Sequence, residues 1–304
     1  MGSRLLPLEV VVVDQSTDDS TAGVVAEFLS ADVPVRHQHL GSVGHTRARN
    51  TGIKISMGEI IAFTDDDCLV DPDWLGNIGE DLSDPNITCV CGRTKPATHD
   101  DRPKQALIST LNSDRRRIIK GKRNPVCIGR GNNMAFRRDE LLRLGAFNEL
   151  MGVGTHVYAG DDIDLFYRVL SAGGWIAYNP EAVVYHAQPD DWQSVIMKKR
   201  GYAISVAAVL GSRARYGDVH ASLLMAGKLA YEFGWLMCGG AIRLKRPLAV
   251  IGWHSLIGSL SGLRYMLNGD FCSEIRRMNR LARESLSRPI VASETHTVTP
   301  ECEA

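Results

Sequence analysis

Three consecutive carboxylates, Asp65, Asp66 and Asp67, are the first group in the sequence that could do chemistry. They directly follow the apolar run 59–64, which predicts a buried strand that holds the acids in a fixed place. Neighbouring carboxylates raise one another's pKa, and a divalent cation with oxygen ligands removes that repulsion. The run therefore predicts a metal site; the alternative is an acidic surface loop or a capping cluster for the helix that opens near Asp71.

A second acidic group, the Gly-Asp-Asp-Ile-Asp run of residues 160–164, stands at the start of an expected helix. Carboxylates are favoured there because the free N–H groups and the helix dipole attract negative charge. One acid is enough for a cap, so the additional acids indicate a further task, such as taking the proton of a substrate hydroxyl. His186 ends a strand-like run and is either an ordinary strand-end residue or a ligand that completes the metal site.

Alternating strands and helices must position these groups. The sequence predicts strands at 9–13, 33–36, 59–64, 87–92, 133–137 and 175–185, and helices ending near 29, at 47–56, from 71 onward and at 162–172. Such alternation predicts an α/β fold with a mostly parallel sheet, helices on both faces and ligand sites beyond the carboxyl ends of strands. Asp14 and the Asp65–Asp67 run both follow such strand ends.

Six segments resemble, in order, the motifs of the family 2 glycosyltransferases, which are inverting enzymes with the GT-A (Rossmann-like) fold. They are VVVDQSTDDST (11–21), GHTRARNTGI (44–53), IAFTDDDC (61–68), GRGNNMAFRRD (129–139), GDDIDLFYR (160–168) and AVVYH (182–186). In that order they resemble the nucleotide-binding strand, the G-x-x-x-A-R-N-x-G motif, the D-x-D metal motif, the acceptor-side strand, the catalytic-base helix and the strand with a late metal-ligand histidine. Six ordered matches are far more specific than any one of them.

The resemblance implies transfer of a sugar, of hexosyl or deoxyhexosyl type, from a nucleotide-diphosphate-sugar donor to a hydroxyl acceptor, with inversion. The implied nucleotide-sugar-binding residues are Asp14, Arg49, Asp65 and Asp66; the implied ligands of Mg²⁺ or Mn²⁺ are Asp67 and His186; the implied base is Asp162; and Asn132, Asn133 and Asp161 are implied on the acceptor side. The chemistry agrees with these roles, since a divalent ion stabilises the anionic leaving diphosphate and a carboxylate base serves a single displacement.

The front of the chain departs from the family pattern. Family members normally begin with an earlier strand and helix, whereas only eight residues precede Glu9. We therefore expect an N-terminally truncated domain with an unpaired strand. The alternative function is a non-catalytic relic of the fold that binds nucleotides or a membrane. Nucleotidyltransferases also use acids at strand ends, but the ordered 160–164 and 182–186 segments weigh against them.

The charge is balanced overall but not along the chain. Lys and Arg number 35 and Asp and Glu also 35, yet residues 1–191 carry 20 basic against 27 acidic side chains and residues 192–304 carry 15 against 8. This balance argues against nucleic-acid binding. Seven cysteines, an odd number, indicate reduced thiols, and no signal peptide is evident, so we expect a cytoplasmic location. The expected divisions are a catalytic domain at 1–191, a helical extension at 192–284 and a disordered tail at 285–304.

The extension contains two apolar stretches, 221–242 and 247–263, on either side of a basic turn. Both are too short or too polar for spanning helices. They either pack on the catalytic domain or form a hairpin that touches an anionic membrane surface, with the chain peripheral at the inner face of the cell membrane. In the second case the acceptor is a lipid-linked or growing surface glycan. A basic run at 115–123 could steer a phosphate-bearing acceptor or could be a solvated helix face or loop.

Overall fold

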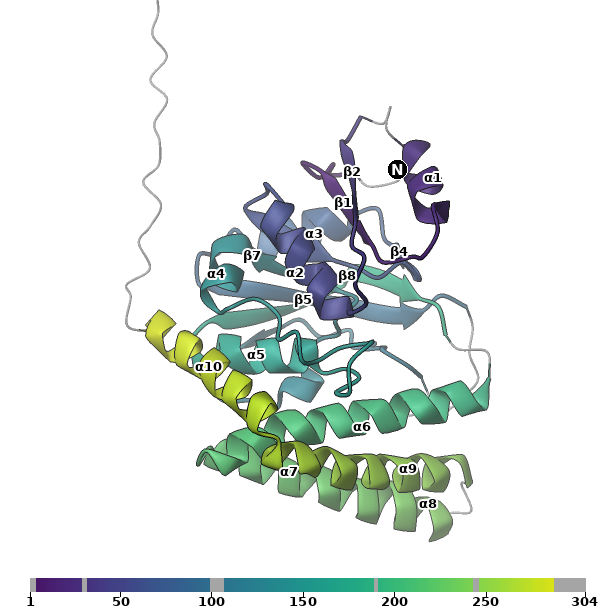
Figure 1. Ribbon diagram of the computed structural model, residues 1–304, viewed down its shortest axis with the longest axis vertical. Helices are drawn as coiled ribbons and strands as arrows, with labels where there is room; N and C mark the ends of the chain where they lie inside the picture. The colour runs from purple at the N-terminus through teal and green to yellow at the C-terminus, as the bar shows by residue number, and fades with distance from the viewer. Residues whose placement is uncertain (1–3, 29–31, 99–106, 189–190, 243–245, 287–304) are drawn as a thin grey trace, which may run out of the picture.

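The computed structural model describes residues 4–28, 32–98, 107–188, 191–242 and 246–286 (Figure 1). A mixed sheet forms its centre, in the order β3 (Ile60–Phe63), β7 (Met134–Arg137), β5 (Ile87–Pro96), β8 (Trp175–His186) and β4 (Cys68–Val70), with β6 (Arg117–Ile119) also paired to β8. β1 (Val10–Asp14) and β2 (Val35–His39) form a separate parallel pair, and among the described strands β1 pairs with β2 alone.

The expected α/β architecture is confirmed, but the prediction of a mostly parallel sheet is wrong. In the central sheet only β5 and β8 run parallel, and the other four pairings are antiparallel. Parallel neighbours need a long crossover, usually a helix. The described residues between β5 and β7 contain the short strand β6 and the short helical turn Pro125–Cys127 but no crossover helix, and β7 pairs antiparallel with β5.

Helices cover both faces of this sheet, as the side chains of β5 show, because they point alternately to one face and the other. Cys89 and Cys91 lie in the core formed with α2 (His45–Ile55), α4 (Arg138–Arg143) and α5 (Asp161–Ser171). Val90, which points the other way, packs with Trp74 and Ile78 of α3 (Trp74–Asp81). Successive side chains of a strand point to opposite faces, so this ten-residue strand supports both cores. α1 (Ser20–Ala26) accompanies the β1–β2 pair (Figure 1).

Several boundaries differ from those expected. β2 begins at Val35 and not at residue 33, and the helix expected from Asp71 begins at Trp74 with Asp73 as its N-cap. The basic run is not a helix face: it contains the edge strand β6, whose Arg117 lies over the Tyr178 ring of β8 at 4.8 Å. Arg116 pairs with the buried Asp81. Arg116 and Arg117, two of the residues that could steer a phosphate-bearing acceptor, therefore contact α3 and β8 instead.

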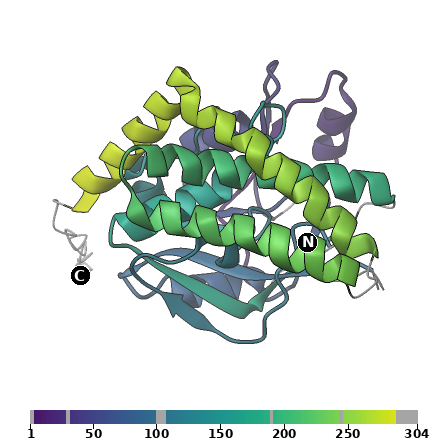
Figure 2. The same ribbon diagram turned by 90° about the horizontal axis from the view of Figure 1, so that it is seen from below.

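A layer of helices follows the last strand. It comprises α6 (Trp192–Arg215), α7 (Val219–Ala230), the π-helical η2 (Tyr231–Cys238), α8 (Gly239–Ile242), α9 (Arg246–Gly262), η3 (Leu263–Leu267) and α10 (Gly269–Leu286). α6 lies against the sheet region, and α7 and α9 lie below it, away from the sheet (Figures 1 and 2). No helix in the described part of the chain is long and apolar enough to cross a membrane. Of the expected tail, residues 287–304 lie outside the described residues.

Close packing of α9 on α6 depends on Gly262 of α9. A Cβ at Gly262 would lie 2.2 Å from the backbone oxygen of Ile204 in α6. Gly262→Ala should therefore lower the free energy of unfolding by about 1–3 kcal/mol, measured by urea titration. The matched control is Gly227→Ala on α7, where a Cβ meets nothing within 4 Å, and where better helix propensity should raise stability by about 0.5–1 kcal/mol. Equal midpoints for wild type and Gly262→Ala would refute the packing argument.

Candidate active site

A buried arginine of α2 joins the three segments that carry the candidate residues. Arg49 Nη1 donates to Asp161 Oδ2 at 2.8 Å, and its Nη2 donates to Asp65 Oδ1 at 2.9 Å and to the Gly131 carbonyl at 2.8 Å. Its guanidinium also lies over the Phe147 ring at 5.5 Å. The loop after β3, the start of α5 and the segment before β7 are therefore held together by one side chain.

The charges in this cluster stabilise one another. Burial alone would raise the pKa of Asp65, but a hydrogen bond with His45 and the charge of Arg49 together lower it well below its usual range. Burial likewise opposes the charge of Arg49, and Asp161 and Asp65 raise its pKa nonetheless. Arg49 and Asp65 therefore remain ionised. Three protein groups accept hydrogen bonds from the guanidinium, so Arg49 fits a positioning role in the nucleotide pocket. Asp66, which follows Asp65 in the chain, is exposed.

Asp162, the expected base, follows Asp161 in the first turn of α5. The helix starts after Gly160, whose φ of 83° lies in the left-handed region that favours glycine. Asp162 Oδ1 accepts a hydrogen bond from the N–H of Ile163 at 2.7 Å. Burial, and then the charge of Asp161, raise the pKa of Asp162 to about 6, although Arg130 and Arg49 oppose the shift. A partly exposed carboxyl group with this pKa suits proton transfer near neutral pH.

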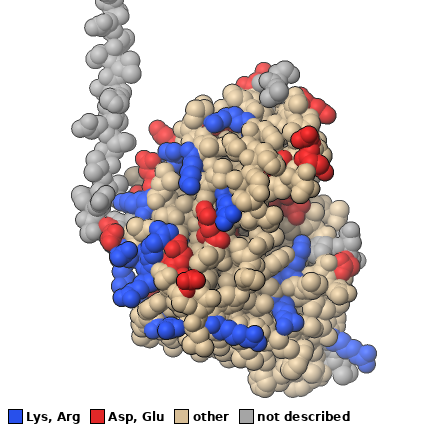
Figure 3. All heavy atoms as spheres, viewed as in Figure 1, with Lys and Arg blue, Asp and Glu red and all other residues tan. Residues whose placement is uncertain are grey.

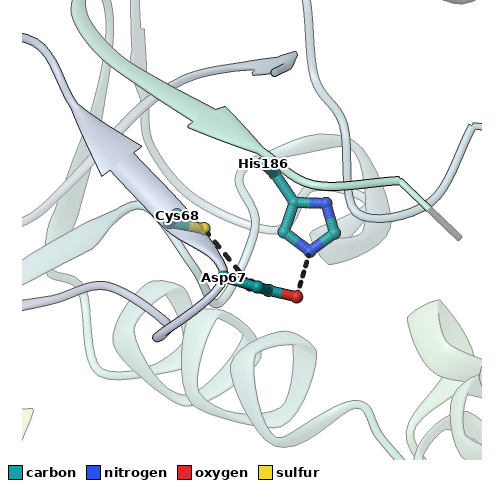
Figure 4. Close-up of side chains that lie close together, drawn as sticks. All are labelled: Asp67, Cys68 and His186. Carbon is teal, nitrogen blue, oxygen red and sulfur yellow. Dashed lines mark hydrogen bonds and ion pairs between the residues drawn. The ribbon is translucent and has the colours of Figure 1, made fainter. Parts of the chain in front are cut away.

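Asp67, Cys68 and His186 form the one group in the described residues with ligand atoms close enough to hold a metal (Figure 4). Pairing of β4 with β8 sets Cys68 opposite His186, and His186 Nε2 lies 3.4 Å from Asp67 Oδ2. Burial lowers the pKa of His186, which favours the neutral imidazole that binds metals. Burial and the charges of Asp65 and Asp67 raise the pKa of Cys68 to about 12, so it remains a thiol.

This donor set fits Mg²⁺ or Mn²⁺. Asp67 is half exposed and offers a carboxylate oxygen, while His186 is 4% exposed and offers a nitrogen from the protein side. Gln188, which the sequence did not single out, orients the ring: its Oε1 accepts from the Ile108 N–H at 2.8 Å and its Nε2 lies 3.1 Å from His186 Nδ1. In this arrangement the ring proton is on Nε2, facing Asp67, and a metal at Nε2 would replace that proton.

Asp14 ends β1, in the separate two-stranded sheet. Its carboxylate accepts from the N–H and the hydroxyl of Ser16 at 2.8 and 2.9 Å, and it lies 3.1 Å from His37 Nε2. These bonds, led by the Ser16 N–H, hold the pKa of Asp14 well below its usual range. Gln15 connects this turn to α2, because its Nε2 donates to the Gly44 carbonyl at 3.3 Å. Asp14 is thus tied to the start of the helix that carries Arg49.

The two asparagines before β7 differ in what they can do. Asn133 is 1% exposed, accepts from the Trp74 indole at 2.8 Å and donates to the Arg93 and Ala182 carbonyls, both at 2.9 Å. All its hydrogen-bonding groups are occupied, so it fits a structural link better than the acceptor contact we expected. Asn132 is also buried; it accepts from the Thr94 hydroxyl at 3.2 Å and donates to the Ser109 carbonyl at 3.5 Å. Asp161 is held by Arg49 and so fits a positioning role.

Sequence reasoning missed a polar group near Asp162. Arg130 Nε donates to the Thr110 carbonyl at 3.0 Å, Lys199 Nζ donates to the Leu107 carbonyl at 2.6 Å, and the Tyr202 hydroxyl lies 2.9 Å from Ser109 Oγ. Burial first, and then Arg130, lower the pKa of Lys199 to about 8. No local pattern marks this group, because it exists only where α6 meets the segment 107–110.

Replacement of Arg49 tests its role. Arg49→Met leaves buried Asp65 and Asp161 without their cation and should lower the free energy of unfolding by about 3–5 kcal/mol at neutral pH. The folded-state pKa of Asp65 is lowered, so this stabilisation is present above the unfolded carboxyl pKa and is lost as pH falls through the folded one. Unfolding curves at neutral and acid pH measure both effects.

The matched control is Arg47→Met on the same helix, where an exposed pair with Glu149 at 3.6 Å predicts a change of about 0–1 kcal/mol. Equal losses for the two variants, or a loss at Arg49 that does not shrink in acid, would contradict the role of the cluster.

Comparisons with known proteins agree with this geometry. The sequence model of Glycosyl transferase family 2 matches residues 4–145. A pre-mycofactocin glycosyltransferase of Mycobacterium tuberculosis is 29% identical over 231 residues, which are 74% of this chain and 46% of that protein. The succinoglycan biosynthesis protein ExoM of Rhizobium meliloti is 28% identical over 220 residues, 71% of this chain and 65% of that protein. The chain thus spans about half the length of the first relative.

Solved structures share the fold. The mannosyltransferase PcManGT from Pyrobaculum calidifontis, in complex with GDP-Man and Mn²⁺, has a TM-score of 0.59 at 20% identity, covering 86% of this chain and 80% of that one. TarS 1–349 of S. aureus has a TM-score of 0.53 at 15% identity, covering 94% and 83%. Residues 4–145 are therefore similar to family 2 of the glycosyltransferases, in agreement with the six ordered motifs, and the described residues share the fold of these solved glycosyltransferases.

Proposed function

We propose that the chain transfers a sugar from a nucleotide-diphosphate-sugar donor to a hydroxyl acceptor by metal-assisted single displacement with inversion. The observation that carries this proposal is Asp162, a partly exposed carboxyl group whose pKa is raised to about 6 beside the braced Arg49 cluster. Residues 1–191 would be the catalytic domain, since they contain every described strand, and residues 192–284 the helical extension.

Donor binding would use both acidic strand ends. Asp67 and His186 would hold Mg²⁺ or Mn²⁺, which offsets the negative charge on a leaving nucleoside diphosphate. In support, the similar structures include PcManGT with GDP-Man and Mn²⁺ and GalNAc-T7 with UDP, GalNAc and Mn²⁺. Asp14, Asp65 and Asp66 would contact the nucleotide. Arg49 would act through Asp65, by keeping that carboxylate charged and in place.

Asp162 would do the proton transfer. The acceptor hydroxyl oxygen attacks the anomeric carbon, Asp162 takes its proton, and the bond from that carbon to the diphosphate oxygen breaks with its electron pair. One in-line displacement puts the new bond on the face opposite the old one, so the anomeric configuration inverts. Asp161 and Asn132 would border the acceptor, with Asp161 fixed by Arg49.

The acceptor would be a glycan or a lipid-linked sugar. Relatives support both classes: an O-antigen chain rhamnosyltransferase of Salmonella typhimurium is 26% identical over 185 residues, and a glucosyl-dolichyl phosphate glucuronosyltransferase of Haloferax volcanii is 25% identical over 189 residues. A lipid-linked acceptor would bring the enzyme to the inner face of the cell membrane.

A donor screen tests the reaction. With Mn²⁺ and a panel of nucleotide sugars, the wild type should release nucleoside diphosphate with one of them, and Asp162→Asn should lower kcat/KM by about 10²–10⁴-fold. The base must be ionised to accept a proton, so wild-type kcat/KM should rise with pH through about 6. The control is Asp139→Asn, an exposed acid in the first turn of α4, which should change neither.

Equal turnover by wild type and Asp162→Asn would remove Asp162 from this role. Nucleotide binding without release from any donor would instead favour a non-catalytic nucleotide-binding protein.

The metal role has its own test. Isothermal titration with nucleoside diphosphates should show binding that needs Mn²⁺ and disappears with a chelator. Asp67→Asn and His186→Ala should each weaken the Mn²⁺-dependent binding by about tenfold or more. Cys68→Ser alters the third member of the same cluster, and since a neutral thiol is a poor ligand for a hard ion, it should bind as the wild type does. Binding that is unchanged by the chelator would contradict the metal site.

A further inference from the structure

Helix α9 and the turn η3 expose a continuous stripe of side chains. Its members are spaced three, four or seven residues apart: Arg246, Val250, Trp253, Leu260, Arg264 and Leu267. Trp253 is 52% exposed, Leu260 55% and Leu267 82%. This spacing places them on one side of the helix, with an arginine near each end and apolar groups between.

Helix α7 adds a second exposed row. Val219 is 70% exposed and Leu223 is 67% exposed, while Ala221 and Met225 on the other side of the helix are buried against α6. On α9 the buried side, which includes Gly258 and Gly262, also packs on α6. The exposed sides of both helices therefore point away from α6. Figure 2 shows both helices in front of α6, with η2, which continues α7, packed against α9. We call this surface, formed by the α9 stripe with Val219 and Leu223, the hairpin face.

The hairpin face has an excess of positive charge. Glu232 is the one carboxylate in the sequence from 219 to 267, and it is 3% exposed. It points inward, paired with Lys228 and accepting from the Ser259 hydroxyl at 2.7 Å. In the described residues, Arg246 and Arg264 stay exposed, and the lower part of Figure 3 shows Lys and Arg without Asp or Glu.

We propose that the hairpin face docks on the surface of a lipid bilayer with anionic headgroups. A contiguous row of exposed large apolar side chains is a feature of surfaces that bind a partner or a membrane. An apolar stripe flanked by arginines and free of exposed carboxylates complements the acyl boundary and the negative headgroups. Trp253, in the middle of the stripe, has the amphipathic ring that favours this depth. Since no described helix can span a membrane, the contact lies in the plane of the interface.

The hairpin face is rigidly joined to the candidate base. Arg213 of α6 is fully buried and donates to Asp164 Oδ1 of α5 at 2.6 Å, two residues after Asp162. Tyr167 of α5 packs with Ala221 and Met225 of α7. Docking would thus fix the active site at a set height above the lipid. The link between docking and a lipid-linked acceptor rests on the proposed function. Docking itself does not, because lipid binding can be measured without donor or turnover.

Vesicle cosedimentation of the full chain tests the proposal. The wild type should pellet with vesicles of phosphatidylcholine and phosphatidylglycerol in equal amounts, and should stay in the supernatant with phosphatidylcholine alone. Trp253→Glu and Leu260→Glu should each weaken the binding by about tenfold or more, because each removes a large apolar contact. The paired change Arg246→Glu with Arg264→Glu should weaken it by a similar factor and reduce its salt dependence.

The control for the apolar variants is Val24→Glu, which changes a 57% exposed valine of α1 in the distant β1–β2 region. It should bind vesicles as the wild type does. Release of nucleoside diphosphate from the donor in the absence of membranes should be the same in all variants, which separates failure of this inference from failure of the proposed reaction. Equal pelleting of Trp253→Glu and the wild type would overturn the proposal. So would a wild type that binds no vesicles but forms a dimer that Leu260→Glu abolishes, because the hairpin face would then bind a second copy of the chain.

Discussion

The buried guanidinium of Arg49 is the interaction on which the candidate site depends. A cation inside a protein is costly unless carboxylates lie beside it, and Asp65 and Asp161 supply them from two segments far apart in the chain. Satisfying Arg49 therefore brings the loop after β3 against the first turn of α5. As a result, Asp161 is paired with Arg49. Asp162, the next residue, makes no ion pair within the described residues, and its pKa is raised to about 6. The same cluster thus orders the site and makes one carboxyl group distinct from its neighbour.

A second buried ion cluster holds the other side of α5. Asp164 accepts from Arg168 at 2.9 Å and from Arg213 at 2.6 Å, and all three side chains are fully buried. Burial would raise the pKa of Asp164, but the two arginines lower it. Asp162 therefore stands between two clusters that fix the start of its helix, one through the sheet domain and one through α6. A helical layer outside the sheet can in this way set the position of the candidate base.

The sequence predicted the elements whose signals are local. The β-branched run before Asp14, the apolar run before Asp65 and the Gly-Asp-Asp start of α5 each carry a strand or helix pattern, and the structure has each element within a few residues. The three-residue strands β4 and β6 are too short to show a periodicity, so they were missed. The prediction of a mostly parallel sheet was wrong because the described residues between β5 and β7 contain no crossover helix.

Partners distant in the sequence could not be predicted. Nothing in the sequence around Arg49 indicated that its guanidinium would donate to Asp161, 112 positions away. Gln188 is near His186 in the sequence, but its amide is fixed by Ile108, 80 positions away. Lys199 lies near Arg130 through the packing of α6 against the segment 107–110, which no local pattern records. Asn133 matched a motif, yet its amide holds three elements together. The motif matches thus predicted a candidate site, and burial and hydrogen bonding in the structure distinguish side chains held by protein partners from the partly exposed Asp162.

The measurement that tests the account most directly is the anomeric configuration of the first product, read by proton NMR during turnover of an active donor. A single carboxyl base beside a metal-bound diphosphate permits one displacement, so the account predicts a product with the configuration opposite to that of the donor. A product that retains the donor's configuration would contradict the account, because it would require a second displacement or front-face attack that this arrangement of Asp162 does not provide.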